Sequence, residues 1–331
     1  MKDFTLSKSV MVLIVIAVLP LCLMGRSVRG DLNRDGCYDV SDVTKLITYA
    51  LNQDWPTGDL PACDLNYDKM VDVTDVTYLI RMVLNGEVPP PPEMTIPEGS
   101  VTYTVGGVSF QMVPVEGGTF TMGGYSQNTT PRHEVTVSGF SIGLTEVTVG
   151  LWKAVMGSFH REMLDDDQPA GGVNWDECQE FISKLNEMTG LNFKLPTEAQ
   201  WEFAARGGNM SQGYTFAGSN DLDEVAWYQA TMPMPGGGYY FVPCVGTKMP
   251  NELGLYDMCG SVREHCQDSW RSNYETDEPQ MDPLYENPLG NSYVARGGCC
   301  SSLQADCAVY SRWQLDHDSG PSVDVGLRLA M

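Results

Sequence analysis

Two segments decide the fold of the larger part of this chain: VNWDECQEFISKLN at residues 173–186 and KLPTEAQWEFAARGG at residues 194–208. In the first, Asn174 is a helix N-cap residue, and Gly190 stands where a left-handed residue would end the helix. Apolar side chains recur between them at helical spacing, which predicts one buried face. That face comprises Trp175, Cys178, Phe181, Ile182, Leu185 and Met188.

The second segment is also typical of a helix, and the chain around both segments indicates a mixed fold. Thr197 and Gln200 have the spacing of a capping box, and Gly207 ends the segment. Over residues 108–140, apolar and polar residues alternate with glycines between them, which predicts short strands. Beyond the second segment, glycine, proline and aromatic residues occur with no sustained period. We therefore expect residues 101–331 to form one α+β domain with much irregular loop.

Five segments stand in a fixed order along this domain. The two above are followed by NELGLYDMCGSVREHCQD at residues 251–268, YVARGG at 293–298 and VGLRLA at 325–330. In this order they resemble the sulfatase-modifying-factor family, the domains related to the formylglycine-generating enzyme, over nearly all of residues 108–330. The resemblance implies a C-type-lectin-like fold with little regular secondary structure, and bound calcium.

The resemblance implies one calcium site in this domain. Asp257 and Glu264 match the family's side-chain ligands, and the carbonyls of Gly260 and Val262 lie between them. Two carboxylates and two carbonyls from one short turn can surround a hard cation. The alternative is an aspartate in a turn and a glutamate on a strand, with no ion.

The family's catalytic chemistry is matched incompletely. The resemblance implies an oxidation of a substrate cysteine to formylglycine with copper held by two thiolates, which are soft ligands that select Cu(I). Counted from Arg296, Cys307 falls on the second thiol position, but Ser302 occupies the first. A hydroxyl is a poor Cu(I) ligand. Cys299, at the position of a family serine, or Cys300 could substitute only if the loop bulged.

Three further positions depart from the family pattern. Arg263 and His265 stand where the family motif has tryptophan, and Leu303 stands where it has the histidine after the first thiol. The copper-binding cysteine pair is thus incomplete, and whether the domain is an enzyme stays open.

An internal repeat precedes this domain. DLNRDGCYDVSDVTKLITYALN at residues 31–52 recurs 33 residues further on as DLNYDKMVDVTDVTYLIRMVLN at residues 64–85. In each copy, oxygen-bearing side chains at loop positions 1, 3, 5, 9 and 12, with a backbone carbonyl at position 7, have the spacing of a calcium loop. The predicted ligands are Asp31, Asn33, Asp35, Cys37, Asp39 and Asp42, then Asp64, Asn66, Asp68, Met70, Asp72 and Asp75.

Each loop leads into apolar residues at helical spacing, so that a loop and a helix occur twice. This arrangement resembles the type I dockerin module and covers residues 31–87 as a small all-α calcium-binding unit. The resemblance implies docking to a cohesin module on a scaffold protein. Lys69 replaces the Gly36 of the first loop at position 6, where the sharp turn favours glycine, so the second site is expected to be weaker. The positions that match the family's partner-reading pairs are Val40, Ser41, Val73 and Thr74.

The remaining segments predict a secretory signal before the repeat and a spacer between the two domains. Lys2 and Lys8 precede an apolar run from residue 10 to 23, which predicts a secretory signal in residues 1–30 and is too short for a membrane span. Residues 88–100, VPPPPEMTIPEGS, contain four consecutive prolines and predict an extended polyproline spacer.

Export changes what the ten cysteines imply, because pairing is the default in an oxidising compartment. Nine remain without Cys22 of the signal, so at least one thiol has no partner within the chain. We expect structural disulfides, with Cys37 and Cys63 as one candidate pair. The candidate partners of Cys307 are Cys266, Cys299 and Cys300. Cys178 matches a family disulfide position whose partner position holds leucine, so we expect a buried free thiol there.

The charge excludes some partners and favours others. With 43 acidic and 20 basic residues the net charge is −23, which excludes an electrostatic nucleic-acid binder and argues against anionic membranes. The 42% hydrophobic fraction excludes wholesale disorder. The expected cofactors are Ca²⁺ at two dockerin sites and one site in the large domain, with copper only if the domain is an oxidase.

These patterns favour a secreted protein that docks on a cohesin-bearing scaffold and presents a non-oxidase domain for a glycan or protein ligand. One alternative is a copper-dependent formylglycine-generating oxidase acting on sulfatase cysteine, with Cys307 catalytic together with Cys299 or Cys300. Another is a component of an extracellular polysaccharide-degrading complex, held at the cell surface.

Overall fold

The computed structural model describes Leu32 and residues 40–52, 75–77, 79–80, 83, 94–161, 164–231, 242–317 and 322–331. The chain divides into two compact units. The smaller contains the first 93 residues, and the larger consists of Met94–Met232 and Val242–Met331. The expected signal at residues 1–30 lies outside the described residues. Within the described ranges, no helix is long and apolar enough to cross a membrane.

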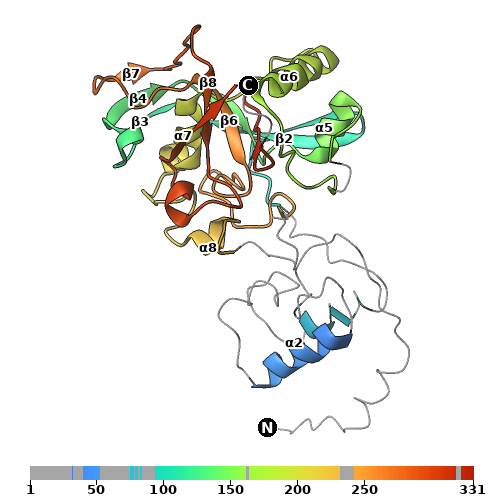
Figure 1. Ribbon diagram of the computed structural model, residues 1–331. Helices are drawn as coiled ribbons and strands as arrows, with labels where there is room; N and C mark the ends of the chain where they lie inside the picture. Colours follow the sequence, from blue (N-terminus) through green and yellow to red (C-terminus); the bar gives the residue numbers. More distant parts are fainter. Residues whose placement is uncertain are drawn as a thin grey trace, which may run out of the picture. The chain divides into compact units, whose positions relative to one another are not determined.

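The described part of the smaller unit is mostly helical (Figure 1). Helix α2 (Val40–Asn52) carries Asp42 in its first turn, and helical residues recur between positions 75 and 83. Apolar side chains at helical spacing are buried among these described residues. They are Val43, Leu46, Val76, Leu79 and Val83.

A hairpin opens the larger unit. Strand β1 (Val101–Val105) pairs antiparallel with β2 (Val108–Val115), and β2 pairs with β5 (Phe140–Gly143). Gly106 and Gly107 form the two-residue connection with φ of 58° and 85°. Two consecutive positive φ angles are what a tight hairpin turn requires, and glycine adopts them without steric cost.

Two further sheets complete the strands. In one, β3 (Gly118–Met122) pairs antiparallel with β4 (His133–Val137), which pairs parallel with β7 (Gln280–Met281). The other has the order β10-β6-β8-β9. Its strands are β6 (Arg263–Ser269), β8 (Ser292–Arg296), β9 (Arg312–Asp316) and β10 (Val325–Gly326). The strands predicted between residues 108 and 140 are confirmed.

The helices of the larger unit begin and end where capping predicts. They are α5 (Val149–Met156), α6 (Trp175–Thr189), α7 (Glu198–Ala205) and α8 (Leu222–Val225), with short 3₁₀ turns η2 (Gln127–Thr129), η3 (Gly208–Met210) and η4 (Gln304–Cys307). Asn174 and Thr197 each accept a hydrogen bond from the backbone N–H three residues on, and both capping boxes form. The prediction that Met188 belongs to the buried face of this helix is wrong. It is 52% exposed, because the last turn of α6 extends past the apolar cluster that buries Leu185.

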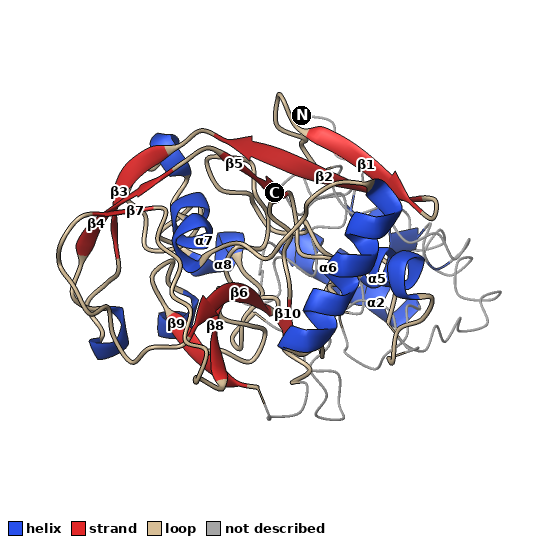
Figure 2. Cartoon of the chain, turned by 90° about the horizontal axis from the view of Figure 1, so that it is seen from above, coloured by secondary structure: helices blue, strands red, loops and turns tan. Residues whose placement is uncertain are grey.

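Two apolar clusters fill the larger unit. One surrounds α7, which lies between the β3–β4 sheet and the β6–β8–β9 sheet (Figure 2) and contributes Trp201 and Phe203. The other joins α5 and α6 to β1 and β2, with Trp152 stacked on Phe181 at 4.9 Å between ring centroids. Few helices, short strands and long loops make an α+β unit, as predicted.

Residues 94–100, part of the expected spacer, belong to the larger unit and pack on it. The backbone N–H of Thr95 donates to the Tyr256 hydroxyl at 2.9 Å, and a Cβ added to Gly254 would lie 2.4 Å from Pro97. Tyr256 leads into the turn that begins at Asp257, so this end of the segment lies next to the predicted calcium turn.

Candidate functional site

The two faces of the β10-β6-β8-β9 sheet have different chemistry. Successive side chains of a strand point to opposite faces, and residues directly paired across strands share a face. Glu264 pairs with Arg296, which pairs with Arg312, and these form what we call the core face. On the outer face, His265 pairs with Ala295 and Ala295 with Trp313, while Val325 pairs with Arg263.

The core face is a closed ionic network with α7. Arg296 forms ion pairs with Glu198 at 3.1 Å and with Glu202, and Arg312 donates to Glu198 at 3.0 Å. Burial alone would raise the pKa of Glu198, but Arg312 and Arg296 hold it below its ordinary value. All four side chains are buried, so each charge depends on its partners. The network fixes the sheet to α7.

The predicted calcium turn lies at the start of β6. Asp257 and Gly260 have φ of 58° and 77°, and Asp257 Oδ2 accepts the Gly246 N–H at 2.6 Å. Both carboxylate oxygens of Glu264 accept hydrogen bonds from Arg328 at 2.7–2.9 Å. Burial, reinforced by Glu264, raises the pKa of Asp257 to about 6.

Glu146, in the loop before α5, is a third buried carboxylate here that sequence reasoning missed. Its Oε1 accepts the Val262 N–H at 3.4 Å, and its Oε2 has no hydrogen-bond partner. Burial and the charge of Asp257 raise its pKa. Among the described residues, neither Glu146 nor Asp257 has a salt bridge. When both are ionised, the turn has an excess of negative charge that a divalent cation would balance. These residues fit calcium only with backbone carbonyls, because no cluster of three or more acidic, His or Cys side chains in the described ranges has metal-binding geometry.

Ser302, at the predicted first thiol position, belongs to a group of side chains that we call the thiol–carboxylate cluster: Cys299, Ser301, Ser302, Asp324 and Arg263. Cys299 Sγ lies 3.1 Å from Asp324 Oδ2 and 3.3 Å from the Ser302 hydroxyl. Ser301 donates to Asp324 at 3.1 Å, and Arg263 pairs with Asp324 at 2.8 Å. The backbone N–H of Cys299 donates to Ser302 Oγ at 3.0 Å. A thiol, two hydroxyls, a carboxylate and a guanidinium therefore meet at one point.

The charge state of the thiol follows from these contacts. A hydrogen bond from Cys300 lowers the pKa of Cys299 to about 7 against the effect of burial, and the Arg263 guanidinium contributes to the shift. The same contact and burial raise the pKa of Cys300. Part of the Cys299 side chain is therefore thiolate at neutral pH.

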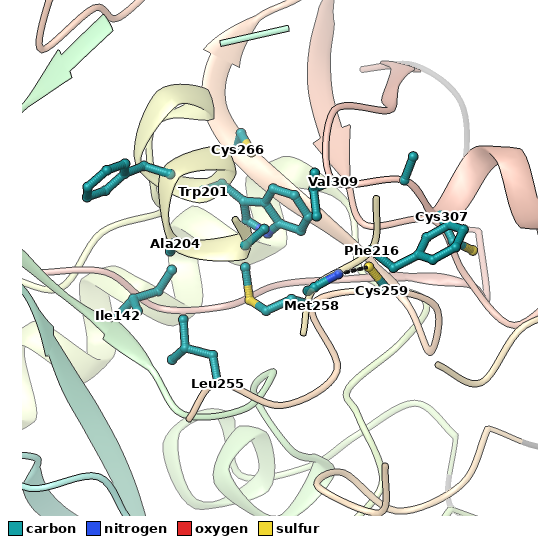
Figure 3. Packing of buried hydrophobic residues seen from close by; sticks show 14 of the residues in the cluster. Ile142, Trp201, Ala204, Phe216, Leu255, Met258, Cys259, Cys266, Cys307 and Val309 are labelled. Atoms are coloured by element: carbon teal, nitrogen blue, oxygen red, sulfur yellow. Dashed lines mark hydrogen bonds between the residues drawn. The ribbon is translucent and has the colours of Figure 1, made fainter. Parts of the chain in front are cut away.

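Cys307 lies outside this cluster. It is buried against the apolar cluster, where Figure 3 shows it and Cys259 beside the Phe216 ring. Burial raises its pKa, with Cys259 and Cys299 adding to the shift, so it is held as a neutral thiol in this state.

The disulfide expected at Cys307 is not present in the structure. Cys299 Sγ points toward Asp324 and the serine hydroxyls, and Cys266 lies near Trp201 on another side of the apolar cluster (Figure 3). The free thiols of the described chain include Cys178, Cys259, Cys266, Cys299, Cys300 and Cys307. Cys178 is fully buried, so the expectation of a buried free thiol there is confirmed. Cys37 and Cys63 lie outside the described residues.

Exposed apolar side chains surround the thiol–carboxylate cluster. Trp313 is 44% exposed, and its ring lies 4.2 Å from the Arg263 guanidinium carbon. Leu303 and Val323, next in sequence to Ser302 and Asp324, are 62% and 56% exposed. Sequence reasoning did not find Asp324 or Trp313, because only the pairing of β6 with β9 and β10 through the sheet brings them to Arg263. A polar centre with an apolar rim can bind a ligand.

The smaller unit's predicted site residues are described only in part. Asp42 and Asp75, at position 12 of the two loops, are buried, and Asp42 Oδ1 accepts the Leu32 N–H at 2.7 Å. Val40 is half-buried and Ser41 exposed at the start of α2. The predicted residues outside the described ranges are Asp31, Asn33, Asp35, Cys37, Asp39, Asp64, Asn66, Asp68, Met70, Asp72, Val73 and Thr74.

Fold and site together define a loop-rich α+β domain with a polar site on the face of a small sheet, preceded by a helical module. The model of the sulfatase-modifying factor enzyme 1-like domain matches residues 107–331, and that of the dockerin type I domain matches residues 29–84. The chain therefore belongs to the sulfatase-modifying factor enzyme 1-like family and carries a dockerin type I domain, as the sequence motifs predicted.

Relatives of the large domain carry different names. Chaperone protein LppX of Paenibacillus barcinonensis is 34% identical over 217 residues, covering 52% of this chain and 75% of that protein. Formylglycine-generating enzyme of Thermomonospora curvata is 29% identical over 170 residues, covering 48% of this chain and 53% of that enzyme. The solved structure of Treponema denticola variable protein 1 superposes with a TM-score of 0.61 at 28% identity, covering 70% of this chain and 98% of that one.

Proposed function

We propose that this is a secreted, scaffold-docking protein whose large domain binds a ligand at the thiol–carboxylate cluster and does not oxidise cysteine. The observation that carries the proposal is Ser302. Its hydroxyl accepts the Cys299 N–H and lies beside Arg263, where the family oxidase has its first copper thiolate. A hydroxyl does not replace a thiolate for Cu(I).

The other cysteines do not restore the pair in this arrangement. Cys299 is hydrogen-bonded to Asp324, and Cys307 is a neutral thiol in an apolar cluster. Two soft thiolates would have to converge, and in the described chain no hydrogen bond or disulfide joins Cys307 to Cys299 or Cys300. The relatives named as a chaperone and as a variable protein support a reading in which this fold serves purposes other than oxidation.

The oxidase is the second candidate function, and one observation favours it. The lowered pKa of Cys299 and its contact with Cys300 would supply a thiolate three residues before Ser302, the predicted first thiol position. If a rearranged loop brought Cys307 to Cys299 or Cys300, the pair could hold copper.

Calcium is the second part of the proposal. We infer that the turn of Asp257, Gly260, Val262 and Glu264 holds one Ca²⁺, with Glu146 as an additional acidic group. Glu146 lines a cavity of about 350 Å³ whose wall includes Asp166 and Asp167, which gives a cation an acidic path to the turn. Hard cations prefer such oxygen donors. Two further ions would occupy the dockerin loops.

Docking is the third part. A dockerin domain implies a cohesin-bearing partner, and we infer that Val40, Ser41, Val73 and Thr74 contact it. Ser41 is exposed at the start of α2, as a contact residue has to be. We place the assembly outside the cell, with membership of a polysaccharide-degrading complex as one form of it, and assign a C-type-lectin-like architecture to the large domain.

A copper assay tests the central claim. The full chain, loaded with Cu(I), is incubated with a Cys-x-Pro-x-Arg peptide, and the peptide is analysed by mass spectrometry for the aldehyde. We expect no aldehyde and no stoichiometric copper uptake. The formylglycine-generating enzyme of Thermomonospora curvata is the positive control. Copper-dependent aldehyde formation by this chain would overturn the ligand-binding proposal in favour of the oxidase.

A further inference from the structure

A narrow pocket continues the outer face of the β10-β6-β8-β9 sheet beyond the thiol–carboxylate cluster. Its volume is about 30 Å³, and its wall includes Trp175, His265, Tyr293, Leu315 and Ser322. Tyr293 pairs with Leu315 across β8 and β9, and His265 lies two residues from Arg263 on the same strand face. The pocket and the cluster therefore belong to one surface.

His265 lines this pocket, and one of its ring nitrogens is buried without a hydrogen-bond partner. The ring is 3% exposed, and its Nε2 lies 3.1 Å from the Val173 carbonyl oxygen. A carbonyl only accepts, so Nε2 carries the hydrogen. Nδ1 has no hydrogen-bond partner in the structure, and no acceptor is there to take a hydrogen from it, so with the hydrogen on Nε2 it keeps its lone pair. A buried polar atom in this state favours any group that brings a donor.

The shape and chemistry of the pocket restrict that donor. A cavity needs about 10–15 Å³ to hold one water, so a pocket of about 30 Å³ admits one or two hydroxyl-sized groups. Trp175 and Tyr293 stack at 4.1 Å between centroids and make one wall apolar. A carboxylate or phosphate oxygen has no hydrogen to donate to Nδ1. Asp316 at the pocket rim further disfavours an anion.

The surface outside the pocket limits the charge and polarity of the part of the ligand that lies there. Arg263 and Asp324 neutralise each other in their ion pair, which leaves no net charge for an ionic ligand, and the exposed ring of Trp313 offers an apolar contact. Ser301 and Asp324 beside it provide further hydrogen-bonding groups. A neutral molecule with many hydroxyls and one apolar face matches this combination, because aromatic contact and scattered hydroxyl hydrogen bonds are then used together.

We propose that the ligand of the large domain is a neutral glycan that lies against Trp313 and inserts one hydroxyl into the pocket, where it donates to His265 Nδ1. This rests on the proposed ligand-binding function and specifies its ligand. The pocket is a specificity element, since a sugar that lacks the inserted hydroxyl, or presents it in the other configuration, would leave Nδ1 without a partner.

Isothermal titration calorimetry of the full chain with neutral oligosaccharides of gluco, xylo, manno and galacto configuration tests this. We expect one configuration to bind. His265→Phe keeps a ring of similar size but removes the acceptor, and should weaken binding about 10-fold or more. Trp313→Ala should weaken it by a similar factor. His265→Gln, which offers an amide oxygen, should retain more affinity than His265→Phe.

Met188→Ala is the matched control, because Met188 is exposed on α6 and 13 residues from Trp175, about 20 Å along the helix. Its affinity should equal that of the unchanged chain, and thermal melts verify that each variant folds. Binding of no oligosaccharide, or equal affinity of His265→Phe and the unchanged chain, would overturn the proposal. So would binding of a serine- and threonine-rich peptide in place of the sugars, and that result would leave the ligand-binding function standing. Copper-dependent aldehyde formation in the separate assay would instead remove that function.

Discussion

The two faces of the β10-β6-β8-β9 sheet differ in how many of their polar groups have a hydrogen-bond or ion-pair partner. On the core face, Arg296 and Arg312 are enclosed by Glu198 and Glu202, and no side of these charges reaches solvent. On the outer face, one residue along the same strands, polar groups have partners only in part, and Trp313 is exposed. Neighbouring positions of one strand thus have different roles: a side chain on the core face stabilises the domain, and the next one, on the outer face, is available to a ligand.

The largest expected effect is on the core face. Arg296→Met would leave Glu198 and Glu202 buried with fewer opposite charges, and should lower the free energy of unfolding by about 3–5 kcal/mol. Trp313→Ala, on the outer face, should lower it by less than about 1 kcal/mol, because Trp313 is 44% exposed. Urea unfolding followed by tryptophan fluorescence measures both. Equal losses in the two variants would mean that the faces do not differ as described.

The second effect concerns the predicted calcium turn, residues 257–264, which runs into strand β6 of this sheet. If Ca²⁺ binds beside Glu146, an ion concentration 100 times the Kd should stabilise the larger unit by about 2.7 kcal/mol relative to a chelator. Glu146→Gln should reduce this gain. In chelator, the same variant should be about 1–3 kcal/mol more stable than the unchanged chain, because the amide is uncharged and ends the repulsion between the buried carboxylates of Glu146 and Asp257.

Thermal melts of both proteins with Ca²⁺ and with chelator measure the two expected changes: the smaller gain from Ca²⁺ and the higher stability in chelator. Glu187→Gln, an exposed change on α6, is the control and should behave like the unchanged chain. A Glu146→Gln variant that is destabilised in chelator would contradict the assignment of excess negative charge at the turn.

The smallest effect is a pH dependence on the outer face. The pKa of Cys299 is lowered to about 7, so folding favours its thiolate. A lowered pKa contributes stability that is present at pH 9 and above and is lost as the pH falls through about 7. Thiolate absorbance near 240 nm should therefore show a midpoint near pH 7. Cys299→Ser should remove it, whereas Cys178→Ser, at a buried thiol with a raised pKa, should leave it in place. A profile without a step between pH 6 and 8 would refute the contact with Cys300 and Arg263.

Sequence reasoning succeeded where the evidence is local. Asn174 and Thr197 were identified as caps because a cap is a contact between residues three apart, and the structure has both. It failed at Met188, because periodicity indicates which face of a helix is apolar but not where the core ends. It missed Glu146, which lies more than a hundred residues before the turn that it contacts, with no motif around it.

Short segments were enough to identify the two domains, their order and the family of each, because calcium-loop spacing, helix caps and ordered motifs are local properties. They also predict that Ser302 stands where a copper thiolate would be. What surrounds Ser302 depends on the three-dimensional fold. Asp324, Trp313 and the buried Nδ1 of His265 reach one surface through strand pairing between distant segments, and pairing register is set by the packing of the whole domain.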